Sequence, residues 1–400
     1  MGKDRDEDVF GLRPPPDTQE LPVVQARSER PAYEQQPQPQ SVPETYAAQP
    51  QTPQNNGGGA GGYPGGPGQP GQPEQPPRRP KKRHPVRKFF VTLLIILLVL
   101  LAAGAGYGWW LLHKFDSQSQ TIENALPDYE GRPAGGPGTN ILLLGSDTRA
   151  ESGSAGEAAA ASGRTDTMMF VHVPKGGGNV TVTSIMRDTW VPIPGHGEAK
   201  INAAFAYGGV PLAAQTVEQL LDTRIDHVAT IDFSGFKGLV DALGGVKVDV
   251  PVPFEKDGTK FEGSMTLNGD QALTFARERK SFKTGDYQRV QDQQILIKAI
   301  MSKAATPSTL ANPVKLNNVV DDFSPYIGVD EDFSGTEIAK LGWGLRGGGD
   351  SVKMFTLPNL GTGWAGGQSI VQPDMDAISD FSEALKKDDM DAFVKDHKLD

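Results

Sequence analysis

The sequence predicts an α/β domain, in which a mixed central β-sheet is covered by helices as an α-β-α sandwich, placed after one transmembrane helix. Three observations lead to this prediction. Residues 89–112 form an uncharged apolar run, the residues before it show almost no apolar periodicity, and from residue 140 onward short apolar strand patterns alternate with helical ones. Such alternation is typical of a sheet with helices packed against it.

Residues 1–88 are predicted to form a disordered tail with a basic end. Pro, Gln, Gly, Glu and Ser dominate tracts such as EQQPQPQ and GGPGQPGQPEQPP. Because these tracts contain almost no apolar periodicity, they cannot bury enough surface to offset the entropy lost on ordering. The tail ends in the basic cluster RRPKKRHPVRK.

The apolar run of residues 89–112 is interpreted as a membrane helix, since a spanning helix needs roughly 20 apolar residues. A cleaved signal peptide would lie at the extreme N-terminus and have a shorter apolar core. A cluster of Lys and Arg precedes the run, whereas only His113 and Lys114 directly follow it. Basic residues favour the cytoplasmic side. We therefore expect a single-pass protein of the cell membrane, with a cytoplasmic N-terminus and extracellular residues beyond Leu112.

The extracellular part is divided by composition. Residues 113–139 contain many Gly and Pro and are predicted to be a juxtamembrane linker. Residues 140–388 are predicted to form one domain, and residues 389–400 a C-terminal tail. The chain has a formal net charge of −10, and its acidic excess lies beyond residue 88. An acidic exterior domain is a poor nucleic-acid binder, so no nucleic-acid partner is expected. The absence of cysteine excludes disulfides, zinc thiolates and thiol nucleophiles.

Three strands are predicted at the start of the domain. NILLLGSD is a buried strand that ends at Asp147, RTDTMMFVHVP is a second that begins just behind Asp166, and VTVTSIM is a third that ends before Arg187. The tight connection KGGGN makes the last two a hairpin, so Asp166 and Arg187 share one sheet edge. If the first strand is antiparallel to the second, Asp147 and Arg149 join them there.

Helices and strands then alternate to the end of the domain. Helical spacing marks PLAAQTVEQLLD, FSGFKGLVDALGG, LNGDQALTFARER and DYQRVQDQQILIKAIMSKA, in which Asp286 is the expected N-cap. Two more helices are expected at residues 312–323 and 374–387. Strands are predicted for HVATIDF, VKVDVPVPF and SVKMFTLP, the second at an edge because of its prolines.

The candidate chemistry lies at the edge shared by the first strands. Two carboxylates facing one gap suit a hard divalent ion, Mg²⁺ or Mn²⁺. Arginine binds phosphate through paired hydrogen bonds, and a helix N-terminus favours anions. Further arginines follow at Arg277 and Arg279, which end one helix, and at Arg289 in the first turn of the next. Residues two apart on a helix diverge, so Arg277 and Arg279 are not expected to point the same way.

Ordinary surface ion pairs are the alternative, because an arginine beside an acid is usually solvated and contributes little. The accumulation of arginines at one rim favours an anion site instead. Ser146 and Ser184 lack a partner histidine and a nucleophile elbow, so serine hydrolase chemistry is disfavoured. His172 lies within a strand and is interpreted as a packing residue.

Seven segments, in this order, resemble the LytR-CpsA-Psr (LCP) family of envelope glycopolymer ligases. They are ILLLGSDTR, GRTDTMMFVHV, SIMRDTWVPIPG, KINAAFAYGG, IDHVATIDFSGFKGLVDALGGVKVDVP, LNGDQALTFARER and GDYQRVQDQQ. The resemblance covers residues 140–304 and extends to about residue 387. It implies the LCP fold, an extracellular catalytic domain and transfer of a glycopolymer from a polyprenyl-pyrophosphate carrier to the 6-hydroxyl of N-acetylmuramic acid in peptidoglycan, which leaves a phosphodiester link.

The resemblance also implies roles for individual residues. Asp147 and Asp166 would hold magnesium, and either could accept the proton of the acceptor hydroxyl. The pyrophosphate contacts would come from Arg149, Arg164, Arg187, Arg277, Arg279 and Arg289, with Lys200 and Gln293 as polar neighbours. The family often has arginine at the position of Asp292, which suggests that one cationic contact is missing or replaced.

Two other functions stay open at this point. A polyprenyl-pyrophosphate hydrolase would use the same site with water as the acceptor. A non-catalytic lipid-binding scaffold would be expected to lack the two acids, and both are present here. The sequence leaves open which glycopolymer is transferred, the prenyl chain length and the oligomeric state.

Overall fold

The computed structural model describes residues 85–146, 165–342 and 351–399. In this part of the chain, a seven-stranded mixed sheet forms the centre. Its strand order is β1 (Gln120–Ile122), β10 (Ile327–Asp330), β7 (His227–Asp232), β2 (Thr139–Ser146), β3 (Thr165–Val173), β4 (Val180–Ile185) and β11 (Val352–Thr356). The mixed central sheet expected from the alternating patterns is therefore present.

Strands β2, β3 and β4 form the core of this sheet and have the predicted arrangement. β2 and β3 are antiparallel, with Ser146 opposite Thr165, and β3 and β4 form an antiparallel hairpin with Met168 opposite Ile185. β2 is also parallel to β7. Since helices cover both faces, β2 is apolar on both, which explains its continuous apolar run.

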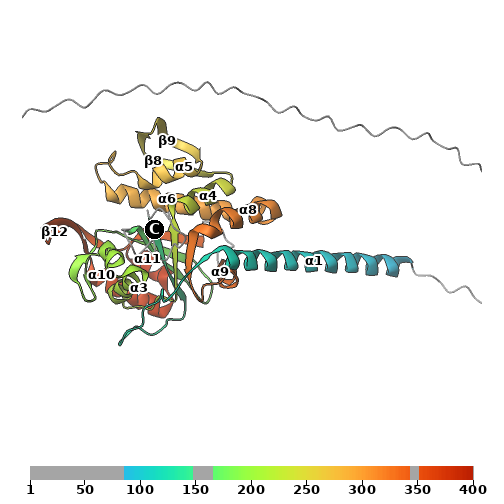
Figure 1. The fold of residues 1–400 in the computed structure, drawn as a ribbon, viewed down its shortest axis with the longest axis horizontal. Helices are drawn as coiled ribbons and strands as arrows, with labels where there is room; N and C mark the ends of the chain where they lie inside the picture. Colours follow the sequence, from blue (N-terminus) through green and yellow to red (C-terminus); the bar gives the residue numbers. More distant parts are fainter. Residues whose placement is uncertain (1–84, 147–164, 343–350, 400) are drawn as a thin grey trace, which may run out of the picture. The chain divides into compact units, whose positions relative to one another are not determined.

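One face of the sheet is covered by three helices, visible with the sheet in Figure 1. Aromatic side chains such as Phe170 and Phe381 pack edge to face in this layer. Helix α3 (Asn202–Leu221) is broken at Gly208 and Gly209, whose backbone is not helical, and Gly209 has a φ of 63° that favours glycine. These helices are α3 (Asn202–Leu221), α10 (Met375–Lys387) and α11 (Met390–Asp396).

The other face carries a second helical layer, with a β-ribbon packed on its outer side (Figure 1). α6 (Asp286–Ala304) lies between the sheet and the ribbon, and its side chains contribute to the hydrophobic cluster against the sheet and to the one beneath the ribbon. The remaining helices here are α4 (Phe233–Ala242), α5 (Gly269–Arg277), α7 (Pro307–Leu310), α8 (Pro313–Phe323), the short 3-10 helix η1 (Ser324–Tyr326) and α9 (Gly335–Gly342). The ribbon consists of β8 (Val246–Lys256) and β9 (Thr259–Leu267), and two further ribbons pair β5 (Trp190–Ile193) with β6 (Gly197–Lys200) and β12 (Asn359–Ala365) with β13 (Gln368–Pro373).

The apolar helix α1 (Pro85–Gln118) is longer than the predicted span of residues 89–112. Its segment Leu93–Gln118 is long and apolar enough to cross a membrane. The helix continues beyond the apolar run because its last turns pack against the domain. The Nζ atom of Lys114 forms an ion pair with Asp321 of α8, and Asp116 accepts a hydrogen bond from the backbone N–H of Gly335 in α9.

Residues 113–139 differ from the predicted linker. β1 lies within this segment and pairs in parallel with β10 as an edge of the central sheet. Arg132 forms a bidentate ion pair with the fully buried Glu218 of α3, with N–O distances of 2.7 to 3.1 Å. The Gly and Pro content therefore marks a connection that is folded onto the domain by strand pairing and a buried charge.

The predicted tail of residues 389–400 is also part of the fold. α11 lies within it, and its Phe393 and Val394 are buried in the core around α3 and α10. The preceding residue Asp388 accepts a hydrogen bond at 2.9 Å from the buried His172, whose pKa is lowered by burial although Asp388 opposes this effect. The interpretation of His172 as a packing residue is confirmed.

Candidate functional site

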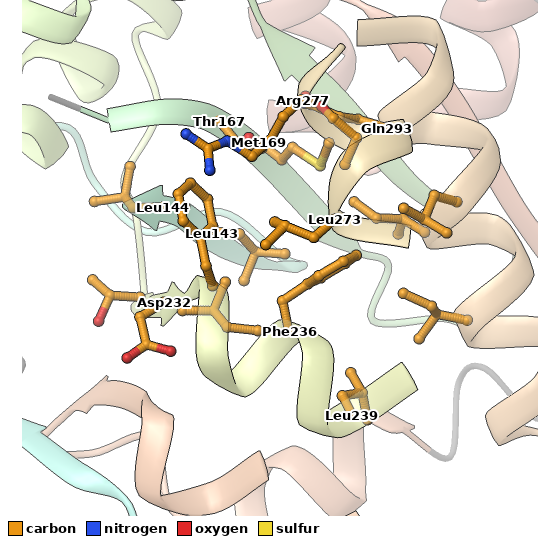
Figure 2. Close-up of a pocket in the computed structure, with 18 of the residues that line it drawn as sticks. Leu143, Leu144, Thr167, Met169, Asp232, Phe236, Leu239, Leu273, Arg277 and Gln293 are labelled. Atoms are coloured by element: carbon orange, nitrogen blue, oxygen red, sulfur yellow. Dashed lines mark hydrogen bonds between the residues drawn. The ribbon is translucent and has the colours of Figure 1, made fainter. Parts of the chain in front are cut away.

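A pocket lies between the face of strands β2, β3 and β7 and the helices α4, α5 and α6. Its volume is about 410 Å³, which is within the usual range for small-molecule sites. Figure 2 shows that Arg277 and Gln293 lie at one end of the pocket, whereas Phe236 and Leu239 lie toward the other. The pocket therefore has a basic end and an apolar interior.

Side chains from both layers form the apolar interior. Successive residues of a strand point to opposite faces of its sheet, so Leu143 and Met169 face the pocket while Leu142 and Phe170 face the core around α3. The helical wall consists of Phe236, Leu239, Leu273, Leu296, Ile297, Ile300 and Phe323. Such a lining suits an apolar chain rather than a sugar.

Among the described residues, four arginines line the basic end of the pocket: Arg187, Arg277, Arg279 and Arg289. Asp286 holds three of them together. Its Oδ2 atom lies 2.9 Å from Nε of Arg187 and 3.1 Å from a terminal nitrogen of Arg289, and its Oδ1 atom lies 3.6 Å from Arg279. The arginines predicted from three separate segments therefore do meet at one place.

The role of Asp286 differs from the prediction. Gly285 occupies the N-cap position of α6 with a φ of 53°, and Asp286 is the first helical residue. From there its carboxylate reaches the arginines instead of capping the helix. The sequence signal was present, because Asp286 lies three residues before Arg289 in a helix, where side chains are neighbours.

Arg277 and Arg279 both line the pocket, contrary to the expectation that they diverge. The expectation assumed a continuous helix, but α5 ends at Arg277 and Glu278 has an extended backbone. The buried Glu278 carboxylate accepts hydrogen bonds from the N–H groups of Arg279, Lys280 and Ser281 at 2.6 to 3.0 Å. Burial alone would raise the pKa of Glu278, but these three donors outweigh it and lower the pKa.

Arg277 reaches from the end of α5 to the start of α4. Its guanidinium carbon lies 4.3 Å from the centre of the Phe233 ring, and Figure 2 shows its side chain extending away from Gln293 across the basic end. Stacking on an aromatic face fixes the plane of a guanidinium while leaving its N–H groups able to donate. Arg277 is thus held by its ring contact, whereas Arg187 and Arg289 are held by Asp286.

Lys200 is near the site but does not line the pocket. Its Nζ atom lies 3.0 Å from Oδ1 of Asp188, whose other oxygen is 3.9 Å from Nε of Arg187. Asp188 therefore connects Lys200 to the arginine cluster. The closer partner of Arg187 is Asp286, so Asp188 is not its main support.

On α6, Gln293 lines the pocket and Asp292 does not. The Nε2 atom of Gln293 donates to the carbonyl of Ala276 at 3.1 Å, which ties α6 to the end of α5. Asp292 is 1 % exposed and accepts a hydrogen bond from Gln288 at 2.9 Å. Asp292 is not among the residues that line the pocket, and its replacement of a cationic contact stays a prediction.

Of the two predicted magnesium ligands, Asp147 and Asp166, the structure describes only the backbone of Asp166. Asp147, Arg149 and Arg164 lie outside the described residues, and for Asp166 the structure describes the backbone in β3. Continuing the register of β3 and β4 by two residues brings Asp166 opposite Arg187. The backbone therefore supports the shared edge, and the roles of these four residues stay predictions.

Asp232 is a pocket residue that the sequence reasoning did not single out. It ends β7, lies opposite Ser146 in the parallel pair with β2, and caps α4 by accepting from the N–H of Gly235 at 2.8 Å. Burial raises its pKa, and the backbone donors of α4 oppose this. The sequence signal was the position of Asp232 between a strand and a helix.

Comparisons with known proteins agree with this architecture. The model of the LytR_cpsA_psr family matches residues 113–387. The chain is 31% identical over 274 residues to the polyisoprenyl-teichoic acid–peptidoglycan teichoic acid transferase TagU of Enterococcus faecalis. The aligned region covers 68% of this chain and 86% of that protein. It is 37% identical over 226 residues to the "Probable cell wall biosynthesis protein LcpB" of Corynebacterium glutamicum, which covers 53% of each.

Solved structures share the fold. The crystal structure of TagV from B. subtilis matches with a TM-score of 0.54 and 27% identity, covering 64% of this chain and 99% of that one. The structure of TagT bound to LI-WTA matches with a TM-score of 0.50 and 26% identity, covering 63% and 90%. The predicted fold class is therefore confirmed.

Proposed function

The chain belongs to the LytR-CpsA-Psr family, and from this premise we propose that it transfers a glycopolymer from a polyprenyl-pyrophosphate carrier to peptidoglycan. The relatives TagU of Enterococcus faecalis and of Bacillus subtilis are named as transferases of teichoic acid from a polyisoprenyl carrier to peptidoglycan. The polymer that this chain transfers is not specified by that similarity.

The observation that carries the proposal is the division of one pocket into a basic end and an apolar interior. A polyprenyl pyrophosphate has the same division, because a doubly charged diphosphate is joined to a long hydrocarbon chain. Four arginines at the basic end suit the diphosphate. The leucine, isoleucine and phenylalanine side chains behind them suit the prenyl chain, whose burial stabilises the complex by removing apolar surface from water.

In the proposed reaction, the 6-hydroxyl oxygen of N-acetylmuramic acid attacks the phosphorus atom attached to the glycopolymer. A new P–O bond forms, the bond from that phosphorus to the bridging oxygen breaks, and polyprenyl phosphate leaves. The hydroxyl proton passes to Asp147 or Asp166. Arg187, Arg277 and Arg289 stabilise the negative charge on the phosphoryl oxygens, since positioning and charge stabilisation dominate phosphoryl transfer.

A divalent ion, Mg²⁺ or Mn²⁺, is part of the proposal. The end of β2 and the start of β3 are paired at one edge of the sheet, with Ser146 opposite Thr165. Asp147 is the next residue after β2 and Asp166 is the second residue of β3, so the proposal assigns both to this edge. Carboxylate oxygens are the ligands that such hard ions prefer, and the ion would add positive charge beside the pyrophosphate. The two aspartates would hold the ion, and the arginines would bind the remaining phosphate oxygens.

We further propose that α1 anchors the chain in the cell membrane as a single span. Its length and hydropathy support the anchor, and the basic cluster before it supports a cytoplasmic N-terminus. This orientation places the domain outside the cell, on the side where peptidoglycan is assembled.

The proposed function is tested with the full chain in lipid nanodiscs, a polyprenyl-pyrophosphate-linked glycan and peptidoglycan fragments. Mass spectrometry should detect the glycan joined to the fragment through a phosphodiester, together with polyprenyl phosphate, only when Mg²⁺ is present. Release of glycan phosphate without coupling to the fragment would instead identify a pyrophosphate hydrolase. Absence of both products would contradict any reaction at this pocket.

A further inference from the structure

A surface at the start of α8 lies at the level of the membrane helix. The hydroxyl of Tyr107 in α1 donates a hydrogen bond of 2.6 Å to the carbonyl oxygen of Pro313, the first residue of α8. Tyr107 stands five residues before Leu112, where the apolar run ends. At a rise of about 1.5 Å per residue, Tyr107 lies about 8 Å inside that boundary. The start of α8 is therefore at the same depth.

A second set of contacts fixes the direction of α8. Lys114 contacts Asn317 at 2.7 Å and also pairs with Asp321, and Gln118 donates to Asp321 at 3.2 Å. Residues later in α1 thus contact residues later in α8, so the two helices lie side by side and run in the same direction. Its N-terminal end, with α7 before it, points back toward the apolar part of α1.

The side chains at this end are apolar and exposed. Leu310 is 57% exposed and Val314 is 66% exposed, and Ala311 and Pro313 between them are also exposed. Single exposed leucines are common on protein surfaces. Here four exposed apolar residues fall within the five positions 310–314, interrupted only by the half-buried Asn312, and they lie beside the end of a membrane helix, where apolar side chains are favoured.

The backbone of this segment also suits a lipid environment. α7 and α8 begin with Pro307 and Pro313, which have no N–H group to leave without a partner. The side chain of Asn312 accepts from the N–H of Lys315 at 3.1 Å and caps α8. Fewer donors are left unpaired at the very end that faces the bilayer, where each would be costly.

We propose that the surface formed by Leu310, Ala311, Pro313 and Val314, here called the α7–α8 surface, inserts into the outer interface of the lipid bilayer. Interfacial segments bury their apolar side about 5–10 Å into this zone, which matches the depth of Tyr107. The proposal rests on the membrane anchor proposed above. Phe323, at the other end of α8, lines the catalytic pocket. The helix that touches the bilayer thus also borders the apolar end where the prenyl chain binds.

The chain contains no cysteine, so single-cysteine variants of the full chain report one position each. Leu310→Cys, Val314→Cys and the control Leu360→Cys are labelled with an environment-sensitive fluorophore and placed in nanodiscs whose lipids carry a nitroxide on the acyl chain. Leu360 is a matched control, since it is 62% exposed and lies on the ribbon β12–β13. Leu100→Cys, within α1, tests the anchor itself.

We expect the label at Leu310 and Val314 to shift to shorter emission wavelength and to lose much of its intensity to the nitroxide, as at Leu100, while the label at Leu360 does neither. Equal quenching at Leu310, Val314 and Leu360, with Leu100 quenched, would overturn the α7–α8 surface and leave the anchor intact. An unquenched label at Leu100 would overturn the anchor and this proposal with it. Neither reading depends on whether the protein transfers a glycopolymer.

Discussion

Replacing Asp292 with asparagine should stabilise the protein above pH 7 and change how its stability depends on pH. The Asp292 carboxyl is 1 % exposed, and its Oδ2 atom has no hydrogen-bond partner among the described residues. Burial raises the pKa of Asp292 to about 7, although the hydrogen bond from Gln288 opposes this. An ionised carboxylate at this place is therefore unfavourable in the folded state.

The magnitude follows from the pKa difference. The folded pKa of about 7 exceeds the ordinary aspartate pKa of 3.8, and at about 1.36 kcal/mol per pKa unit the difference corresponds to about 4 kcal/mol. The folded chain keeps this proton up to about pH 7 and the unfolded chain loses it above about pH 4, so the free energy of unfolding falls across that interval and is level above it. Asparagine removes this fall.

Asparagine also has a cost, because its N–H group would occupy the place of Oδ2 and lack an acceptor, at about 1–3 kcal/mol. Asp292→Asn should therefore be less stable than the parent chain near pH 4 and more stable by about 1–3 kcal/mol near pH 8. Urea unfolding of the full chain in detergent, followed by near-ultraviolet circular dichroism at several pH values, measures both. The control is Asp249→Asn on an exposed face of β8. Equal pH profiles for the Asp292 variant and the parent would refute the reasoning.

Four further substitutions test the site and the fold. Arg187→Lys should reduce transfer about a hundredfold, since a point charge does not replace the planar fork, whereas Arg224→Lys outside the pocket should leave the rate within about twofold; similar rates for both would make Arg187 a surface pair. Asp166→Asn should abolish Mg²⁺-dependent transfer with an unchanged melting temperature, and retained transfer would remove Asp166 from the metal site. Leu273→Asp should weaken binding of a long-chain prenyl pyrophosphate by about tenfold or more but not binding of inorganic pyrophosphate, in calorimetric titrations; equal losses for both ligands would place the prenyl chain elsewhere. Arg132→Met leaves the buried Glu218 unpaired and should lower the free energy of unfolding by about 3–5 kcal/mol, and an unchanged urea midpoint would show that residues 113–139 are a linker after all.

The sheet edge of the site could be predicted because it depends on local rules. A short connection between two strands forces a hairpin, and a hairpin places the start of β3 and the end of β4 at one edge. The continuous apolar run of β2 predicted a buried strand, and β2 does lie inside the sheet between β7 and β3. β7 pairs in parallel with β2, and β11 pairs in parallel with β4. The sequence carries no signal for which distant strand takes such a place.

The two ends of the domain could not be placed from composition. Glycine and proline in residues 113–139 indicated a flexible connection, yet β1 there completes the sheet beside β10. Residues 389–400 are predicted to be a tail, whereas Phe393 supplies an aromatic contact to Phe381 and Phe355. In both cases a few residues find their partners far away in the sequence, and short segments contain too little periodicity to reveal this.

The arginine cluster shows why helix ends matter more than helix content for a site of this kind. α5 and α6 were both predicted, but Arg279 reaches the pocket only because Glu278 stops α5 and turns the chain with three hydrogen bonds. A similar event begins α6, where Gly285 caps the helix and Asp286 becomes free to join Arg187, Arg279 and Arg289. Since Asp286 is itself an anion among cations, a bound diphosphate would compete with it for the same N–H groups. Asp286 thus keeps the arginines in place, and because its carboxylate carries less charge than a diphosphate, the proposed ligand would be expected to replace part of its contacts.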